Sequence, residues 1–403
     1  MRLYWFMAFG VLFAYFMYCP LPDGIAEPMT LRVVFATRQI AKLVGIGPVL
    51  FGFTDRINFT RLALSFQGRL FSSDEPSVTF HDEIFDGVRV HVYQPVEKSN
   101  EPIAGMVYIH GGGWVFGSVD SYHHQTNYMA ARLGIVLVSI DYRCAPEHPF
   151  PVPLQDVVKA TVWFLQHAKD YNVDPHRIAL VGVSAGGNLA AATANLLTLQ
   201  EEYKQMSLPK VKFQGLIYPC LQSLNFLTPS YQQNKNFFIL NQHMMAEFWS
   251  LYLTGSLTYV AAMKVNNHTS PPVKKDQRHI MHHDVIPTEF KQRDYTPPND
   301  SDFGDVEISA HLESYILNPS FAPLMASTVE GLPPAYIVTA EFDVLRDDGI
   351  FYAKKLEDAN VPVTWKHYKS GWHGMLTLFT GPLTCAVCKQ SMDELLQFSR
   401  DNL

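Results

Sequence analysis

The hydrophobic and polar positions along the chain follow two patterns, one typical of strands and one typical of helices. Six short apolar runs have the length of buried strands, and segments with helical spacing separate them. The runs lie near residues 104–109, 135–140, 178–183, 213–218, 335–339 and 363–367. The helical segments lie near residues 122–133, 153–169, 185–199, 347–358 and 384–401. Strands that alternate with helices of this length predict an α/β fold with a mainly parallel sheet covered on both faces.

Three parts of the chain depart from this rhythm. Residues 78–93 hold two alternating runs joined by Asp86-Gly87, which is typical of a β-hairpin and predicts a mixed sheet. Residues 26–71 have helical apolar spacing and precede the sheet. Residues 221–332 are irregular and rich in Pro, Asn and His, and a structureless stretch of this length is implausible, so we expect helices there. We interpret residues 26–71 and 221–317 as cap elements, the second over the carboxyl ends of the strands.

Composition and charge limit the classes of protein that this chain can represent. The chain has 403 residues, of which 47% are hydrophobic, enough for a large core. The net charge of −7 offers no basic surface for nucleic acid, so we expect no nucleic-acid partner. These values fit one large α/β domain with insertions, or two domains.

The N-terminal segment predicts a membrane anchor. Residues 3–19 form a stretch of 17 residues without a charge, preceded by Met1-Arg2. As a helix it would span about 25 Å, enough for a thin bilayer. The alternative is a cleaved signal peptide, with a small-x-small site at residues 24–26. Both alternatives place the remainder in the secretory lumen, and we expect an anchor at 1–22 and a single domain at 23–403.

Other features fit a lumenal address without adding a metal site. Three Asn-x-Ser/Thr sequons are candidates for glycosylation, at Asn58, Asn267 and Asn299. Cys385 and Cys388 form a C-x-x-C pair without a second pair, which favours spare thiols or one local disulfide. Three nearby histidines are interpreted as a solvated loop rather than a metal site: His279, His282 and His283.

The candidate nucleophile is Ser184. Residues 182–186, Gly-Val-Ser-Ala-Gly, lie between a predicted strand and an Ala- and Leu-rich predicted helix. This strand, turn and helix form the context that a G-x-S-x-G nucleophile elbow requires. The glycines let neighbouring backbones approach a serine held in a strained turn. The helix N-terminus then points its dipole and free N–H groups at the reaction centre.

A second glycine-rich stretch strengthens this interpretation. Residues 110–114, His-Gly-Gly-Gly-Trp, directly follow the predicted strand 104–109. Consecutive glycines leave backbone N–H groups open to an anion. We expect three amides to form an oxyanion hole, with His110 and Gly111 as supports of the loop. The amides are those of Gly112, Gly113 and Ala185.

A serine nucleophile needs a base and an acid that orients the base. His373 follows the predicted strand 363–367 in a turn with flanking glycines, which would project its imidazole over the strand ends. Asp343 is the first aspartate after the strand near 335–340 and is the candidate acid. Three further carboxylates remain competitors: Glu341, Asp347 and Asp348. The chain order serine, aspartate, histidine is that of the α/β-hydrolase fold.

These motifs resemble a known group of enzymes. Residues 110–114, 182–187 and 141–151 are similar to the signatures of the hormone-sensitive-lipase group of serine esterases. Residues 341–349 and the apolar N-terminus narrow the resemblance to the arylacetamide deacetylase and deacetylase-like family. The resemblance covers the whole chain and is weakest over residues 221–317. It implies a single-pass membrane esterase with its catalytic domain in the lumen of the endoplasmic reticulum.

The sequence departs from the family pattern at two places. The family usually has Asp before the nucleophile, where this chain has Val183, so a polar support for the oxyanion loop is missing. The resemblance to arylacetamide deacetylase implies a disulfide between cysteines at the positions of Val115 and Ala340. Both residues are apolar here, so that bridge is absent, which points to a deacetylase-like relative.

We therefore expect acyl transfer from an ester to water, without metal or cofactor. The substrates would be small or lipophilic esters. One alternative is a lipase acting on acylglycerols or sterol esters, and another is an amidase for acetyl-amides. The alternative from another class is a non-catalytic binding protein with a hydrolase fold, and such proteins usually lack a member of the triad.

Overall fold

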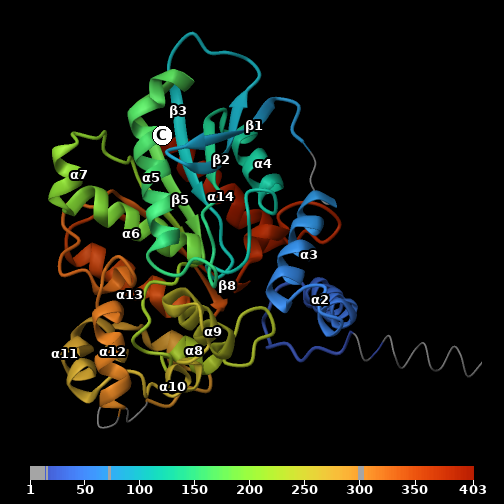
Figure 1. Ribbon diagram of the computed structural model, residues 1–403, viewed down its shortest axis with the longest axis vertical. Helices are drawn as coiled ribbons and strands as arrows, with labels where there is room; N and C mark the ends of the chain where they lie inside the picture. The colour runs from blue at the N-terminus through green and yellow to red at the C-terminus, as the bar shows by residue number, and fades with distance from the viewer. Residues whose placement is uncertain (1–13, 15–16, 71–73, 298–303) are drawn as a thin grey trace, which may run out of the picture.

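The structure is a computed structural model that describes residues 14, 17–70, 74–297 and 304–403 (Figure 1). Its centre is an eight-stranded sheet with the order β1-β2-β4-β3-β5-β6-β7-β8. The strands are β1 Val78–Phe85, β2 Val88–Pro95, β3 Ile103–Ile109, β4 Val136–Ile140, β5 Val173–Val183, β6 Gln214–Ile217, β7 Ala335–Phe342 and β8 Val363–Trp372. Strands β1 and β2 pair antiparallel, β2 pairs antiparallel with β4, and all other pairs are parallel. The predicted mixed, mainly parallel sheet is confirmed.

Helices cover both faces of the sheet because the central strands are apolar on both sides. In β3, Val107 and Ile109 belong to one buried cluster, while Met106 and Tyr108 belong to the other. This alternation follows from the two-residue period of a strand. The first cluster is closed by α5 Val152–His167, α6 Ala185–Leu199 and α13 Arg346–Asp358, and the second by α4 His123–Leu133 and α14 Ala386–Asn402.

The insertion between β6 and β7 is helical, as expected. Its helices are α8 Pro229–Gln233, α9 Gln242–Thr254, α10 Val260–Lys264, α11 Pro271–Met281 and α12 Val306–Ile316. They form the lower end of the molecule in Figure 1. The Asn241 side chain accepts a hydrogen bond from the Met244 amide and caps α9. The Asn234 side chain donates to the Asp343 carbonyl at 3.2 Å, so the insertion contacts the loop that follows β7.

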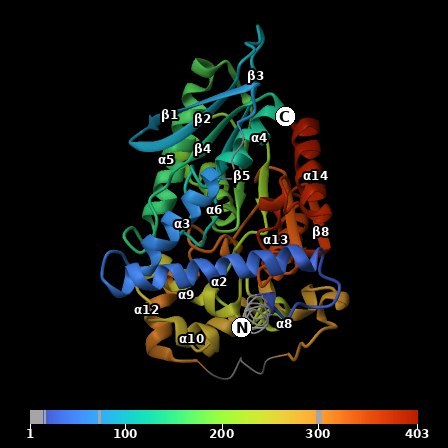
Figure 2. The same ribbon diagram turned by 90° about the vertical axis from the view of Figure 1, so that its right-hand side faces the viewer.

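Residues 26–71 hold two helices, α2 Pro28–Leu50 and α3 Arg56–Leu70. Figure 2 shows α2 lying across the face of the molecule toward the viewer, with α3 rising from near one end of it. By length and composition, α2 is also apolar enough to span a membrane. The predicted anchor at residues 3–19 lies almost entirely outside the described residues.

The remaining elements are short. Helix α7 is Glu201–Gln205, and the 3-10 turns are η1 Ala168–Tyr171, η2 His283–Val285, η3 Thr288–Lys291, η4 Pro323–Met325 and η5 Met375–Leu378. Within the described part of the chain, no group of three His, Cys, Asp or Glu side chains is placed to hold a metal ion. Instead, His282 pairs with Asp284 at 2.9 Å in the His-rich loop.

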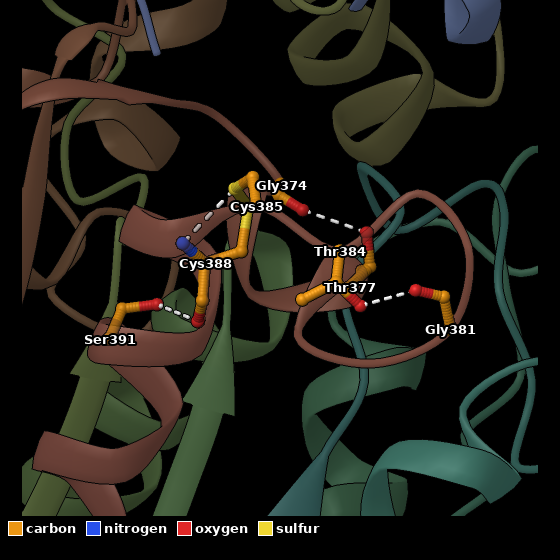
Figure 3. Close-up of a disulfide and its surroundings, with 7 residues drawn as sticks. All are labelled: Gly374, Thr377, Gly381, Thr384, Cys385, Cys388 and Ser391. Atoms are coloured by element: carbon orange, nitrogen blue, oxygen red, sulfur yellow. Dashed lines mark hydrogen bonds between the residues drawn. A yellow bond between two sulfur atoms is a disulfide. The ribbon is translucent and has the colours of Figure 1, made fainter. Parts of the chain in front are cut away.

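The C-x-x-C pair forms a disulfide at the start of α14 (Figure 3). The Cys388 amide donates to Cys385 Sγ at 3.1 Å, so the bridge also caps the helix. Hydroxyl groups close the turns between β8 and this helix, with Thr377 donating to the Gly374 carbonyl and Thr384 to that of Gly381. Of the two alternatives left open for this pair, the local disulfide is the one observed.

Candidate active site

Ser184 sits at the turn between β5 and α6 in a strained backbone conformation. Its φ is 57° and its ψ is −117°, a region that side chains larger than glycine rarely occupy. A Cβ on Gly182 would lie 2.0 Å from the Gly186 carbonyl oxygen, and a Cβ on Gly186 would lie 2.1 Å from the Ile109 carbonyl oxygen. The two glycines are therefore required by close packing. The turn lifts Ser184 out of the sheet at the carboxyl end of β5.

The candidate base and the candidate acid come from the ends of the next two long strands. Strands β7 and β8 extend further than expected, to Phe342 and Trp372, which are register partners. The turn predicted over residues 369–374 is therefore wrong for residues 369–372, because pairing with β7 keeps them in the sheet. Asp343 and His373 are the first residues beyond the two strands, so they emerge side by side.

The three side chains form a continuous hydrogen-bonded chain. The distance between His373 Nε2 and Ser184 Oγ is 3.0 Å, and that between His373 Nδ1 and Asp343 Oδ2 is 2.8 Å. A carboxylate only accepts hydrogen bonds, so Nδ1 carries the proton and Nε2 is left to accept from the serine. Asp343 is fully buried, and its second oxygen accepts from the Leu345 amide at 2.9 Å. The acid is thereby held in one orientation.

Glu341, a competitor for the acid role, faces a different set of partners. Its carboxylate contacts Arg293 at 2.9 Å, Arg346 at 3.0 Å and His367 at 3.6 Å. Burial would raise the pKa of Glu341, but the nearby His367 imidazole and the two guanidinium groups lower it to about 2. Glu341 therefore stays ionised in this cation cluster.

Asp347 and Asp348 do not reach His373 either. Both are fully buried in the first turn of α13. Asp347 accepts from Arg346 Nε at 3.0 Å and from the Ser230 amide at 2.6 Å. Asp348 accepts from the Leu221 amide and from the Gln222 side chain, and burial raises the pKa of Asp348 to about 8 despite these hydrogen bonds. Both carboxylates thus join residues 221–230 of the insertion to α13, and they do so from the first turn of that helix.

The glycine-rich loop adopts a conformation that needs its glycines. Gly112 has φ 122° and Gly113 has φ 63°, and a Cβ on Gly112 would lie 2.2 Å from the Phe116 carbonyl oxygen. Among the described residues, neither amide makes a hydrogen bond within the protein. The Ala185 amide is the first of α6 and has no partner inside its helix. These three N–H groups are therefore free to donate to a ligand, as the predicted oxyanion hole requires.

His110 and Gly111 support this loop from beneath. The His110 ring stacks on Tyr142 with centroids 4.2 Å apart, and its Nδ1 lies 2.9 Å from the Gly111 carbonyl oxygen. Burial lowers the pKa of His110, so the ring is neutral and donates from Nδ1. A Cβ on Gly111 would lie 2.7 Å from the Val183 carbonyl oxygen, which brings the loop close to the elbow.

At the two places where the sequence departs from the family pattern, apolar side chains are buried in the core. Val183 is buried in the same apolar cluster as Tyr108 and Met106. Val115 and Ala340 are fully buried and belong to opposite clusters of the core. Apolar packing thus occupies the positions where the resemblance implies a carboxylate and a disulfide.

The sequence did not single out three side chains that contact the site. The Tyr218 ring lies 4.7 Å from that of His373, and Tyr218 directly follows β6. Phe248 of α9 covers Gly113, whose added Cβ would lie 2.5 Å from its ring. Arg61 of α3 donates to the Val115 carbonyl at 2.8 Å and pairs with Glu147. Only Tyr218 could have been found from the sequence, because it lies at the end of a predicted strand between β5 and β7.

The candidate glycosylation sites differ in their surroundings. Asn58 is exposed in the first turn of α3, where its amide donates to Asp55. Asn267 is half-buried, and the hydroxyl residue of its sequon, Thr269, is buried. Asn299 lies outside the described residues.

Comparisons with known proteins match the part of the chain that holds the candidate active site. A family model described as the alpha/beta hydrolase fold matches residues 106–275 and 255–377. Neutral cholesterol ester hydrolase 1 of Rattus norvegicus is 39% identical over 409 residues, covering 97% of each chain. Arylacetamide deacetylase of Oryctolagus cuniculus is 38% identical over 377 residues, covering 91% of this chain and 92% of the relative. Among solved structures, one titled bacterial heroin esterase aligns with a TM-score of 0.65 at 26% identity, covering 86% of this chain and 92% of that one.

Proposed function

This chain belongs to the α/β hydrolase family and is an ester hydrolase, and we propose that Ser184, His373 and Asp343 are its catalytic triad. The single observation that carries the proposal is the hydrogen-bonded chain through His373, with 3.0 Å to Ser184 and 2.8 Å to Asp343. Both distances are within reach of proton transfer.

In the proposed reaction, Ser184 Oγ attacks the ester carbonyl carbon while His373 Nε2 takes its proton. Asp343 keeps the imidazole in the required tautomer and stabilises the imidazolium. The imidazolium returns the proton to the leaving alcohol, and an acyl-serine remains. Water then attacks the acyl-serine with His373 again as base, which releases the acid and restores the serine.

The oxyanion that forms in each half of the reaction would be held by the amides of Gly112, Gly113 and Ala185. Each such donor contributes on the order of 10²–10³ in rate. We expect little reorganisation of this loop when charge develops, because Gly112 and Gly113 are already held at positive φ. The reaction requires neither a metal nor a cofactor.

We propose lipophilic esters as the substrates. The two relatives act, by their names, on cholesterol esters and on arylacetamides, so a sterol or acylglycerol ester and an acetyl-amide are the alternatives. A hydrolysis panel of p-nitrophenyl esters from acetyl to oleoyl, with cholesteryl oleate and phenacetin, tests this proposal. Preference for the longer esters supports it, and confinement of activity to the amide contradicts it.

We further propose that residues 1–22 anchor the chain as a type II protein of the endoplasmic reticulum. The domain at 23–403, with cap elements at 26–71 and 221–317, would lie in the lumen. Secretion after signal cleavage is the alternative. Carbonate-washed membranes should retain the protein, and glycosidase treatment should shift it if the sequons at Asn58, Asn267 or Asn299 are used. A soluble, unglycosylated protein would contradict the proposal.

A further inference from the structure

Helix α2 presents its apolar residues to the outside of the molecule. Eight of the twenty exposed large hydrophobic side chains in the described residues lie between Met29 and Phe53. Ile40, Leu43, Val44 and Leu50 are spaced i, i+3, i+4 and i+10, which places them on one face of the helix, and they are 50–76% exposed. A surface helix of a globular protein normally turns such a stripe toward the core. We call this exposed face, together with Phe51 and Phe53, the α2 surface.

The opposite face of α2 is fixed to the body of the protein. Arg38 donates to the carbonyls of Phe238 and Ile239 at 3.2 and 3.3 Å, and the Phe35 ring lies 5.2 Å from that of Phe238. The Ala26 amide, just before the helix, donates to the Ser370 carbonyl of β8 at 2.9 Å. These contacts hold α2 so that its apolar residues face outward.

Charge on the same segment favours an anionic partner. Residues 28–70 carry six cationic residues and one carboxylate, a net charge of +5, in a chain whose net charge is −7. Lys42 and Arg56 are exposed. Exposed cations beside an exposed apolar face are typical of a helix that lies in the interface of an anionic bilayer.

The anchor proposed for residues 1–22 would place this surface near a membrane. Only residues 20–27 separate the uncharged segment 3–19 from α2, a distance of at most about 28 Å when fully extended. Helix α2 is long enough to span a bilayer, but doing so would bring Arg32, Arg38 and Lys42 into hydrocarbon. It would also break the contacts of Arg38 with residues 238 and 239.

We propose that the α2 surface docks flat into the headgroup region of an anionic membrane and holds the active site beside the bilayer. The N-terminal residues 26–61, which include α2, contact the backbone on both sides of the candidate active site. Ala26 binds β8 three residues before His373, and Arg61 of α3 binds the Val115 carbonyl next to the oxyanion loop. The docked enzyme would therefore meet lipophilic esters at the bilayer in which they dissolve. The part of this inference that concerns substrate rests on the proposed function.

Lipid contact is tested directly on the full chain, reconstituted in phosphatidylcholine–phosphatidylserine vesicles that contain brominated lipid. The variants are Phe53→Trp on the α2 surface, Phe35→Trp on its inner face and Ile84→Trp on β1, each compared with the native tryptophan signal. We expect quenching of the added emission at position 53 alone. Quenching at position 35 as well would mean that α2 spans the bilayer. No quenching at position 53 would overturn the proposal, and a dimeric protein would then identify a second copy as the partner.

Hydrolysis supplies the second test. The variant Leu50→Ser/Phe51→Ser/Phe53→Ser is compared with a matched control, Ile84→Ser/Leu257→Ser/Val306→Ser, whose residues are also exposed but lie elsewhere. The first variant should lose about tenfold in rate on p-nitrophenyl oleate held in vesicles and stay within about twofold on soluble p-nitrophenyl acetate. Equal rates for both variants on the oleate would overturn the proposal. If the wild type hydrolyses neither ester, the proposed function fails and the quenching result alone decides the docking.

Discussion

Phe342 of β7 and Trp372 of β8 are register partners at the end of the sheet, and each directly precedes a member of the proposed triad. The pairing shifts register between Ala340 and Phe342, so an irregularity in the strand sets which residues leave the sheet together. Without this shift, the aspartate would not emerge opposite His373. The 2.8 Å bond between Asp343 and His373 is therefore a consequence of strand pairing as much as of loop conformation.

The first prediction concerns the nucleophile. Ser184→Ala should abolish labelling by a fluorophosphonate probe while leaving the protein folded. Ser184→Gly should be equally inactive yet more stable than the alanine variant by about 1 kcal/mol, because a φ of 57° favours glycine. Labelling and thermal unfolding measure both effects, with Ser139→Ala as a control at a buried serine. Labelling that survives in Ser184→Ala would reject the assignment.

The second prediction separates the acid from its neighbour. Asp343→Asn should reduce turnover on the order of 10⁴-fold, because the imidazole then adopts the wrong tautomer. Asp347→Asn should keep most of its turnover per folded molecule but lose about 2 kcal/mol of unfolding free energy, because the buried Arg346 guanidinium keeps Glu341 but loses its second partner charge. Ester hydrolysis and denaturant unfolding are measured side by side. The reverse pattern would show that Asp343 is not the acid.

The third prediction tests the glycine-rich loop. Gly113→Ala should lower turnover by about 10²-fold or more, because the added methyl group would collide with Phe248 and displace the donor amides. Gly331 has a φ of 75° with open space around it, so Gly331→Ala carries a similar backbone strain without the collision. Turnover of the two variants should therefore differ even when their stabilities are alike. Equal turnover would argue against an oxyanion role for this loop.

The fourth prediction concerns pH. The pKa of Asp348 is raised from 3.8 to about 8, so between these values the native state holds a proton that the unfolded state releases. Stability from this group is therefore greatest at low pH and falls as pH rises toward 8. The unfolding free energy of the wild type relative to Asp348→Asn should decrease between about pH 5 and about pH 8. Urea unfolding at both pH values checks this, and a constant difference would show that Asp348 is ionised throughout.

The sequence was sufficient to predict the sheet because a buried parallel strand is a short run of apolar residues bounded by turns. It was also sufficient to place the glycines of the elbow, since only glycine tolerates a carbonyl at 2.0 Å from its Cβ position. The strand ends were less certain. Polar residues at the end of β8, such as Lys369 and Ser370, resemble a turn, and only pairing with β7 keeps them extended.

Contacts across the insertion could not be predicted in the same way. Phe248 contacts Gly113 from a helix that is distant in sequence, and the hydrophobic pattern of the chain does not predict such a contact. The partners of Asp347 and Asp348 come from residues 221–230, which carry no motif. Both carboxylates looked like residues at a helix start, and their burial became apparent only from the tertiary structure.

The order of the triad along the chain has a consequence for the nascent protein. The nucleophile and the oxyanion loop are synthesised early, but the base follows β8, the last strand in the described part of the chain. A chain that stops anywhere before His373 holds a serine without a base and lacks the partner strand that orients Asp343. If the proposed triad is correct, products of translation that stop before His373 are therefore inert toward esters. A molecule with hydrolytic activity has been translated at least through the last strand of the sheet and the histidine that follows it.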